Sequence, residues 1–210
     1  MKRLVSVAAL ALIVVTVPLL AQSPKGWKVR ADRSTSASDP DGAGAIKFVT
    51  AGSGFHATTP QAAVFWNPAN TITGNYTLKG TFKLLKPSGH TNYYGLVFGG
   101  SDLEGANQNY TYFLVAQDGS WLVKRRNGEA TENVVAKTPS DAVKKPDASG
   151  QSTNALEVRV LADKLEFAVN GTVVGSAPKT GAAAKTDGIY GIRSNHLLDI
   201  EVDGLSAAKR

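Results

Sequence analysis

Apolar and polar residues alternate along most of the chain, with the two-residue period of β-strands. The pattern is clearest over residues 75–86, where one face is polar and the other carries four large apolar residues: Tyr76, Leu78, Phe82 and Leu84. About a dozen short segments of this kind are separated by turns rich in Gly, Pro, Asn and Asp. The sequence has no long helical period and no repeat of fixed length. The pattern predicts an all-β, jelly-roll β-sandwich.

The densest stretch, residues 92–128, reads as three consecutive strands that are apolar on both faces. In the first strand, one face carries Tyr94, Leu96 and Phe98 and the other carries Tyr93 and Val97. In the second strand, one face carries Tyr110, Tyr112 and Leu114 and the other carries Phe113 and Val115. Such strands either lie inside a sandwich or line a groove with one face. Three glycines in the first strand make room on that face for a ligand or a neighbouring chain: Gly95, Gly99 and Gly100.

The N-terminal residues predict export. Lys2 and Arg3 precede an apolar run that ends near Ala21, which is typical of a secretory signal peptide over residues 1–21. An uncleaved anchor is the alternative, but the run is shorter than the roughly 20 residues of a spanning helix and contains Pro18. We therefore expect a secreted or periplasmic protein without a membrane span after cleavage. A polar segment over residues 22–43, with a short strand near Trp27, would precede a sandwich domain over residues 44–210.

Composition excludes several classes of chemistry. The absence of cysteine excludes a thiolate nucleophile, a Cys-based zinc site, a disulfide framework and a lipoprotein anchor. The formal charge is +6, but the basic residues are scattered, with clusters only at residues 124–126 and 144–145. Together with export, this distribution makes nucleic acid an unexpected partner.

The loop after the first central strand is a candidate binding site. Asp102 and Glu104 lie there beside four tyrosines of the flanking strands, and carboxylates with aromatic rings suit sugar hydroxyls and the apolar face of a pyranose. An ordinary hairpin loop above core tyrosines is the alternative. Further residues could share a face with this loop in a sandwich. The expected ligand-binding set is Tyr93, Tyr112, Trp121, Arg125, Arg193 and His196.

Metal and serine chemistry find little support in the sequence. The motif over residues 39–42, Asp-Pro-Asp-Gly, could offer carboxylates to calcium, but a plain turn is favoured. His56, His90 and His196 are far apart and lack the spacing of a zinc site, and Ser53 is not in a Gly-x-Ser-x-Gly motif. We therefore expect neither a metal nor a cofactor.

The order of features from residue 154 to 207 carries a family resemblance. A strand beginning Asn-Ala-Leu-Glu-Val leads to a hairpin at Asn170-Gly171, then to the strand Gly-Ile-Tyr-Gly-Ile-Arg, and then to a terminal strand with Asp199 and Asp203. This order resembles the concanavalin A-like lectin/glucanase superfamily, especially its bacterial secreted branch of 3-keto-disaccharide hydrolase-like domains. The resemblance extends over roughly residues 45–207 and implies a lectin-like domain. The hydrolase-like branch tends to carry an Arg where this chain has Gly99.

Three carboxylates of the terminal strand alternate, namely Asp199, Glu201 and Asp203. Similar alternating carboxylates serve as nucleophile and acid in laminarinase-type relatives, and a retaining mechanism requires a pair about 5 Å apart. A solvated outer face is the favoured interpretation here, because the motif is terminal and begins and ends with Asp.

Taken together, these features favour a protein that binds an oligosaccharide or polysaccharide in an aromatic-lined groove. One alternative is a glycoside hydrolase of the 3-keto-disaccharide type, with Asp102 or Glu104 as acid or base. Another is a non-catalytic domain that binds a protein partner in the envelope.

Overall fold

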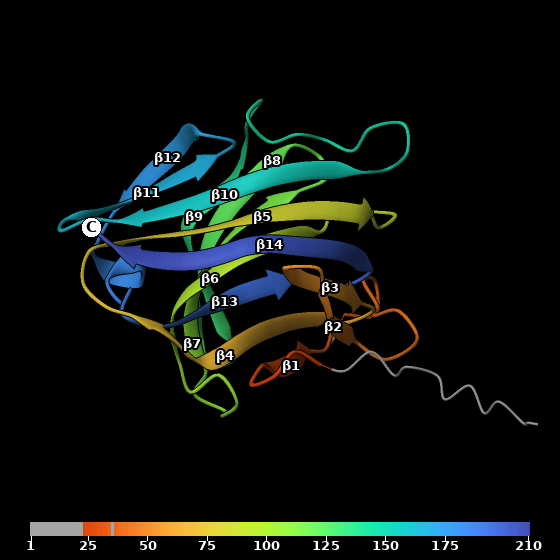
Figure 1. The fold of residues 1–210 in the computed structure, drawn as a ribbon, viewed down its shortest axis with the longest axis horizontal. Helices are drawn as coiled ribbons and strands as arrows, with labels where there is room; N and C mark the ends of the chain where they lie inside the picture. Colours follow the sequence, from red (N-terminus) through yellow and green to blue (C-terminus); the bar gives the residue numbers. More distant parts are fainter. Residues whose placement is uncertain (1–22, 35) are drawn as a thin grey trace, which may run out of the picture.

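A computed structural model describes residues 23–34 and 36–210 of the chain. Within these residues, fourteen strands form two seven-stranded sheets, and all the paired strands are antiparallel. The sheets stack face to face, with β10, β5 and β14 crossing the front of Figure 1. The prediction of an all-β, jelly-roll β-sandwich is confirmed. The predicted signal peptide lies outside the described residues.

The first sheet is the one that holds the central strands. Its order is β1 (Lys28–Asp32), β4 (Ala62–Ile72), β13 (Gly188–Ser194), β6 (Tyr93–Ser101), β7 (Asn109–Ala116), β8 (Ser120–Asn127) and β9 (Ala130–Pro139). The second sheet has the order β12 (Thr172–Pro178), β11 (Lys164–Val169), β10 (Ser152–Val160), β5 (Tyr76–Lys86), β14 (Leu198–Lys209), β3 (Gly54–Thr59) and β2 (Lys47–Ala51). A single 3₁₀ turn, Gly181–Ala183, precedes β13.

The core between the sheets follows from the alternation in the sequence. The apolar face predicted for residues 75–86 is fully buried in β5, at 0% exposure for each member: Tyr76, Leu78, Phe82 and Leu84. The first sheet contributes the inward residues of its central strands, among them Tyr94, Leu96, Phe98 and Phe113. Apolar burial from both sheets therefore stabilises the fold, as expected for a chain without disulfides.

Two predicted turns join neighbouring strands as expected. Asn170 and Gly171 connect β11 to β12, and both have positive φ, at 51° and 85°. That combination fits the type I′ turn, whose twist matches the flanking strands. Gly119, with φ of 87°, closes the turn between β7 and β8 in the same stretch of the chain.

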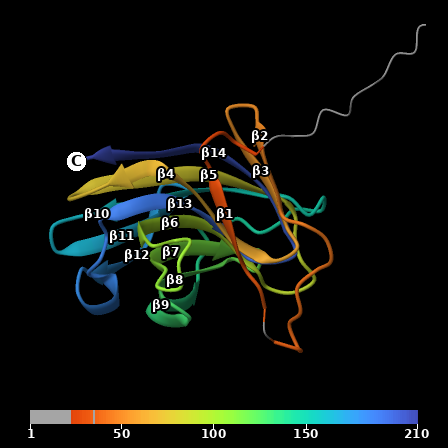
Figure 2. The same cartoon turned by 90° about the horizontal axis from the view of Figure 1, so that it is seen from below.

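Part of the polar segment predicted over residues 22–43 belongs to the sandwich. Its strand β1 pairs with β4, with Lys28 opposite Trp66 and Asp32 opposite Ala62, so β1 forms an edge of the first sheet. In Figure 2, β1 runs at a steep angle to β6 and β7. The first sheet thus includes strand β1, although the sequence pattern predicts that the sandwich domain begins at residue 44. The helical turn expected near residues 140–143 is a single turn, in which the Val143 amide donates to the Ser140 carbonyl at 3.1 Å.

Candidate functional site

The outer face of the first sheet carries a second apolar cluster, which the sheet itself separates from the core. We call it the outer-face cluster, and its buried members are Val64, Trp66, Val97, Leu103, Tyr110, Tyr112, Leu114 and Leu122. The alternation in β6 and β7 explains its position, because every second side chain of these strands points away from the core. The two-sided apolar pattern of the central strands therefore builds two separate clusters.

Arg193 of β13 is the charged centre of the outer-face cluster. Its Nη1 donates to Asp32 Oδ2 and, at 2.8 Å, to the hydroxyl of Tyr110, and its guanidinium carbon lies 5.3 Å from the centroid of the Tyr112 ring. Burial alone would raise the pKa of Asp32, but the charge and hydrogen bond of Arg193 outweigh burial and lower it. Both groups of this buried pair are therefore charged, as buried ion pairs require.

Edge strand β1 and the loop between β6 and β7 close one end of this face. Arg30 of β1 donates through Nη1 to the carbonyl oxygens of Leu103 and Gly105, at 3.4 and 2.5 Å. Asp32 accepts from the Tyr110 hydroxyl at 3.2 Å. Because the sheet is curved, Asp32 of edge strand β1 reaches Tyr110 of β7, four strands away in the sheet order. Strand β1 and the β6–β7 loop therefore cover this end of the outer-face cluster.

The opposite end of the face remains more open. Tyr93 is partly exposed and packs against the outer-face cluster, and its hydroxyl lies 3.3 Å from Ser120 Oγ. Tyr112 and Leu122 each keep 7% exposure, and Lys124, opposite Tyr112 in the register of β7 and β8, is partly exposed. We refer to these four residues as the aromatic strip.

Trp121 and Arg125 lie on the other face of the first sheet from Tyr112. The Trp121 ring is in the core, with its centroid 5.9 Å from Phe113 and 6.1 Å from Phe167. Arg125 is buried, and its Nη1 donates to Thr111 Oγ1 and the Lys185 carbonyl, both at 2.9 Å.

Burial lowers the pKa of Arg125 to about 10. The expectation that Trp121 and Arg125 share one groove with Tyr112 is wrong, because successive side chains of β8 point to opposite faces.

The carboxylates of Asp102 and Glu104 both contact groups of the chain itself. Asp102 has a positive φ of 49°, and its carboxylate accepts from the amide of Asn107 at 3.2 Å. Glu104 forms an ion pair with Lys28 of β1 and is exposed. These contacts shape the β6–β7 loop and attach it to the edge strand.

The carboxylates of β14 lie on the outer face of the second sheet. Ile200 and Val202 enter the core, whereas Asp199, Glu201 and Asp203 point away from it. Asp199 Oδ1 lies 2.5 Å from His56 Nε2, on the adjacent strand β3. This placement agrees with the favoured interpretation of a solvated face.

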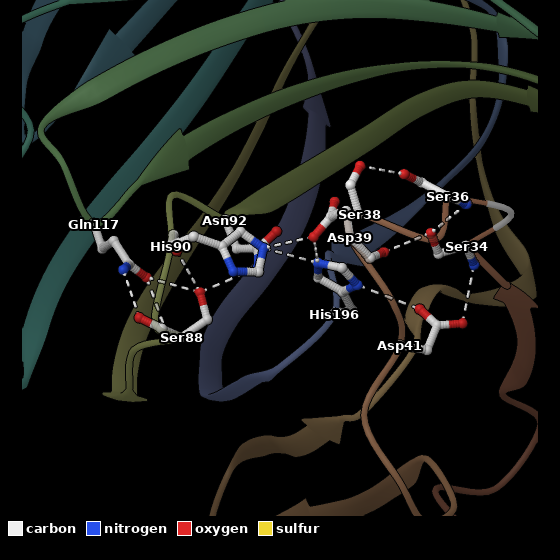
Figure 3. Close-up of polar contacts among 10 residues, drawn as sticks. All are labelled: Ser34, Ser36, Ser38, Asp39, Asp41, Ser88, His90, Asn92, Gln117 and His196. Carbon is white, nitrogen blue, oxygen red and sulfur yellow. Dashed lines mark hydrogen bonds and ion pairs between the residues drawn. The ribbon is translucent and has the colours of Figure 1, made fainter.

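His196 lies in neither cluster but at the end of the sandwich, where three connections meet. Figure 3 shows its ring beside that of His90, at nearly a right angle to it, with the carboxylate of Asp39 near both rings. The two Nε2 atoms are 3.1 Å apart, and Asp41 approaches the other ring nitrogen of His196. The Asp-Pro-Asp-Gly segment expected to be a plain turn thus supplies two carboxylates to the histidine pair.

Two recesses border this end of the sandwich. The larger, of about 610 Å³, is lined by backbone and side chains of residues 42–45, 58–60, 86–89 and 197–199, together with Lys47. We call it the end groove. Leu197 on its wall has a positive φ of 58°, which is unusual for a branched residue. A smaller cavity of about 150 Å³ lies between Arg193 and His196, and Asn92 also lines it.

The sequence interpretation missed Trp66 in the outer-face cluster and Asp32 as the partner of Arg193. It also missed Asp39 and His90 as neighbours of His196. Asp32 meets Arg193 across 161 residues, and His90 meets His196 across 106. No local spacing could have revealed either pair. Only the register of the sheet and the meeting of its end loops bring them together.

Comparison with known proteins gives the fold but no family. No protein-family model matches the sequence, and no curated protein matches it. Solved structures do match. The carbohydrate binding module CBM66 from Bacillus subtilis has a TM-score of 0.61 at 11% identity, with 88% of this chain and 96% of that one covered.

Two further structures agree with the first. A Bacillus subtilis protein of unknown function with a galectin-like fold has a TM-score of 0.58 at 14% identity, covering 89% of this chain and 91% of that one. A Bacteroides ovatus GH16 protein, solved with a mixed-linkage glucan product, has a TM-score of 0.56 at 8% identity, covering 90% and 97%. The chain therefore has the concanavalin A-like β-sandwich fold expected from the resemblance. Within the described residues, no helix has the length and apolarity needed to span a bilayer.

Proposed function

We propose that the protein is an exported carbohydrate-binding protein and that the glycan packs on the aromatic strip. The observation that carries the proposal is the pair of tyrosines, Tyr93 and Tyr112, on the outer face of a concanavalin A-like sheet. Tyr93 offers the partly exposed ring, and Tyr112 forms the floor of the site on top of Arg193.

The chemistry of the aromatic strip suits a sugar. The apolar face of a pyranose packs on an aromatic ring, while its hydroxyls take hydrogen bonds from charged and amide groups at the rim. Lys124 stands beside Tyr112, and Arg126, also partly exposed, is the next residue of β8 with the same orientation. The ion pair beneath Tyr112 fixes the position of its ring, so little ordering would accompany binding.

The similar structures support the class of ligand. One is described as a carbohydrate binding module, and another was solved with a glucan product. They share the fold with this chain at low identity, so they support carbohydrate as the ligand without identifying the sugar.

A glycan array on the purified protein, followed by calorimetric titration of each glycan that binds, tests the proposal. We expect Tyr93→Ala and Lys124→Ala to weaken binding at least tenfold. Lys86→Ala, in the end groove, is the matched control and should bind as the wild type does. If Lys86→Ala weakens binding and Tyr93→Ala does not, the glycan occupies the end groove and the aromatic strip is the wrong surface.

A folded protein that binds no glycan would overturn the proposal. Capture of an envelope protein by the same preparation would then favour the interaction-domain alternative. The hydrolase alternative requires turnover of a bound sugar that is lost in Asp102→Asn or Glu104→Gln. The contacts of these carboxylates with Asn107 and Lys28 favour a role in loop structure instead.

Export is part of the proposal, and it has its own test. Processing after Ala21 predicts a mature protein that begins at Gln22. Mass spectrometry of the exported chain should find this N-terminus. An intact N-terminus on a membrane-associated chain would support the anchor instead.

A further inference from the structure

The cluster at the end of the sandwich brings three potential metal ligands together from three separate connections. Asp39 belongs to the segment between β1 and β2, His90 to the β5–β6 loop, and His196 to the turn between β13 and β14. Asp39 Oδ1 lies 2.9 Å from His90 Nε2 and 3.2 Å from His196 Nε2, and the two Nε2 atoms are 3.1 Å apart. The three atoms form a nearly equilateral triangle (Figure 3).

Hydrogen bonding alone does not account for this triangle. Each imidazole nitrogen either donates one hydrogen bond or accepts one. The carboxylate of Asp39 requires a donor at His90 Nε2, whereas the amide nitrogen of Asn92, 3.1 Å away, requires an acceptor at the same atom. A cation placed against the triangle would satisfy the carboxylate and both imidazoles, because it takes the lone pairs of both Nε2 atoms and of the carboxylate oxygen together. The Asn92 amide then keeps its other acceptor, Ser88 Oγ, at 3.0 Å.

We propose that Asp39, His90 and His196 bind a divalent transition-metal ion, with zinc as the best fit. Zinc takes nitrogen and carboxylate oxygen ligands at about 2.0–2.2 Å, and tetrahedral geometry then places neighbouring ligand atoms about 3.3 Å apart. The three distances between the ligand atoms are close to that value. Calcium and magnesium prefer sites made wholly of oxygen, which two imidazoles do not provide.

The surroundings of His196 are those of a metal ligand. Its Nδ1 lies 3.3 Å from Asp41 Oδ1, and Asp41 Oδ2 in turn accepts from the amide of Ser34 at 2.9 Å. A carboxylate on the far ring nitrogen holds that nitrogen protonated and turns the Nε2 lone pair toward the metal. The His196 side chain is 6% exposed, so its orientation is fixed by packing, whereas His90 is 45% exposed and gives solvent access.

The bound ion would join the three connections that frame the end groove. Gly42, Gly89 and Leu197 line that groove, and each is within three residues of a ligand. Three protein ligands leave a fourth position of a tetrahedral zinc ion open to water or to an exogenous group. Metal binding would therefore fix the rim of the groove and leave one coordination position free beside it.

Calorimetric titration of tag-free protein with ZnCl₂, and absorption spectroscopy with Co²⁺, test this site. We expect one ion per chain, visible d–d bands of a four-coordinate Co²⁺ complex, and a melting temperature that rises with zinc concentration. His90→Ala and Asp39→Ala should abolish binding. Asp41→Asn, which alters only the group behind His196, should weaken binding about 10–100-fold.

His56→Ala is the matched control, since His56 also contacts an aspartate but lies outside the cluster. It should bind zinc as the wild type does. Failure of the folded wild type to bind zinc overturns the inference, and so does unchanged binding in His90→Ala. Circular dichroism of both histidine variants confirms that a loss of binding is not a loss of folding. None of these results depends on the proposed glycan site.

Discussion

Arg193 and Asp32 form an ion pair across 161 residues of the chain, and their side chains are only 10% and 9% exposed. Asp32 is in edge strand β1, and Arg193 is in β13, with β4 between them. The pair therefore attaches the N-terminal edge of the sandwich to the middle of its first sheet. The ring of Tyr112 packs on the same guanidinium, so this attachment also sets the floor of the aromatic strip.

Removal of one partner of this pair should be costly. We expect Asp32→Ala to lower the free energy of unfolding by about 3–5 kcal/mol, because the guanidinium of Arg193 is left buried without its counter-charge. Urea denaturation measures the change. The double variant Asp32→Leu with Arg193→Met removes both charges and should lose far less. A cost below about 1 kcal/mol for Asp32→Ala would contradict the buried pair.

Acid should weaken the same attachment. The pKa of Asp32 is below its ordinary value of 3.8 in the folded protein, so the unfolded state binds the proton more readily. The contribution of Asp32 is therefore complete above pH 3.8 and is lost as the pH falls through the lower, folded-state pKa.

The difference in unfolding free energy between wild type and Asp32→Ala should be constant near neutral pH and should shrink as the pH falls from about 5 downward. Urea denaturation at several pH values measures it. A difference that stays constant over that range would show that Asp32 is not titrating in the folded protein below its ordinary pKa.

Trp121 should matter for stability and not for sugar binding. Its ring packs between Phe113 and Phe167 in the core, and Trp121→Ala should cost about 3–5 kcal/mol. Thermal or urea denaturation checks the cost. The exposed Val173 is the control, and Val173→Ala should stay within about 0.5 kcal/mol of wild type. Weakened glycan binding by folded Trp121→Ala, without a change in stability, would place this ring in the site after all.

The sequence was sufficient for the fold because each strand carries its own period. The four inward residues of β5 and the Asn170-Gly171 turn are local signals, and local signals specify strands and hairpins. The period of β6 and β7 also showed that both faces are apolar. It did not show which side chains of β8 join Tyr112, because the face of each strand depends on its register with neighbours. For that reason the sequence alone groups Trp121 with Tyr112, although the two lie on opposite faces.

The Arg193–Asp32 pair and the group of Asp39, His90 and His196 depend on long-range geometry, which the sequence pattern shows only in part. The sequence predicts that Arg193 binds a ligand, but Asp32, which neutralises it, lies in a segment that the sequence pattern separates from the sandwich domain. His90 is isolated in the sequence, because 106 residues separate it from His196. Loops that meet at the end of a sandwich leave no periodic trace in the sequence, so only the assembled fold reveals such a pair.

Asn154 should stabilise the connection that precedes β10. Its buried amide accepts from the backbone N–H of Lys144 at 2.9 Å and donates to the Lys144 carbonyl at 3.0 Å, and it also accepts from Asn170 at 2.9 Å. Asn154→Ala leaves the backbone N–H and C=O of Lys144 without these partners, and we expect it to lower the free energy of unfolding by about 1–3 kcal/mol. Urea denaturation measures the loss, and faster hydrogen exchange of the Lys144 amide locates it. Exposed Asn133→Ala is the control, and an equal effect of both substitutions would show that the amide of Asn154 contributes nothing specific.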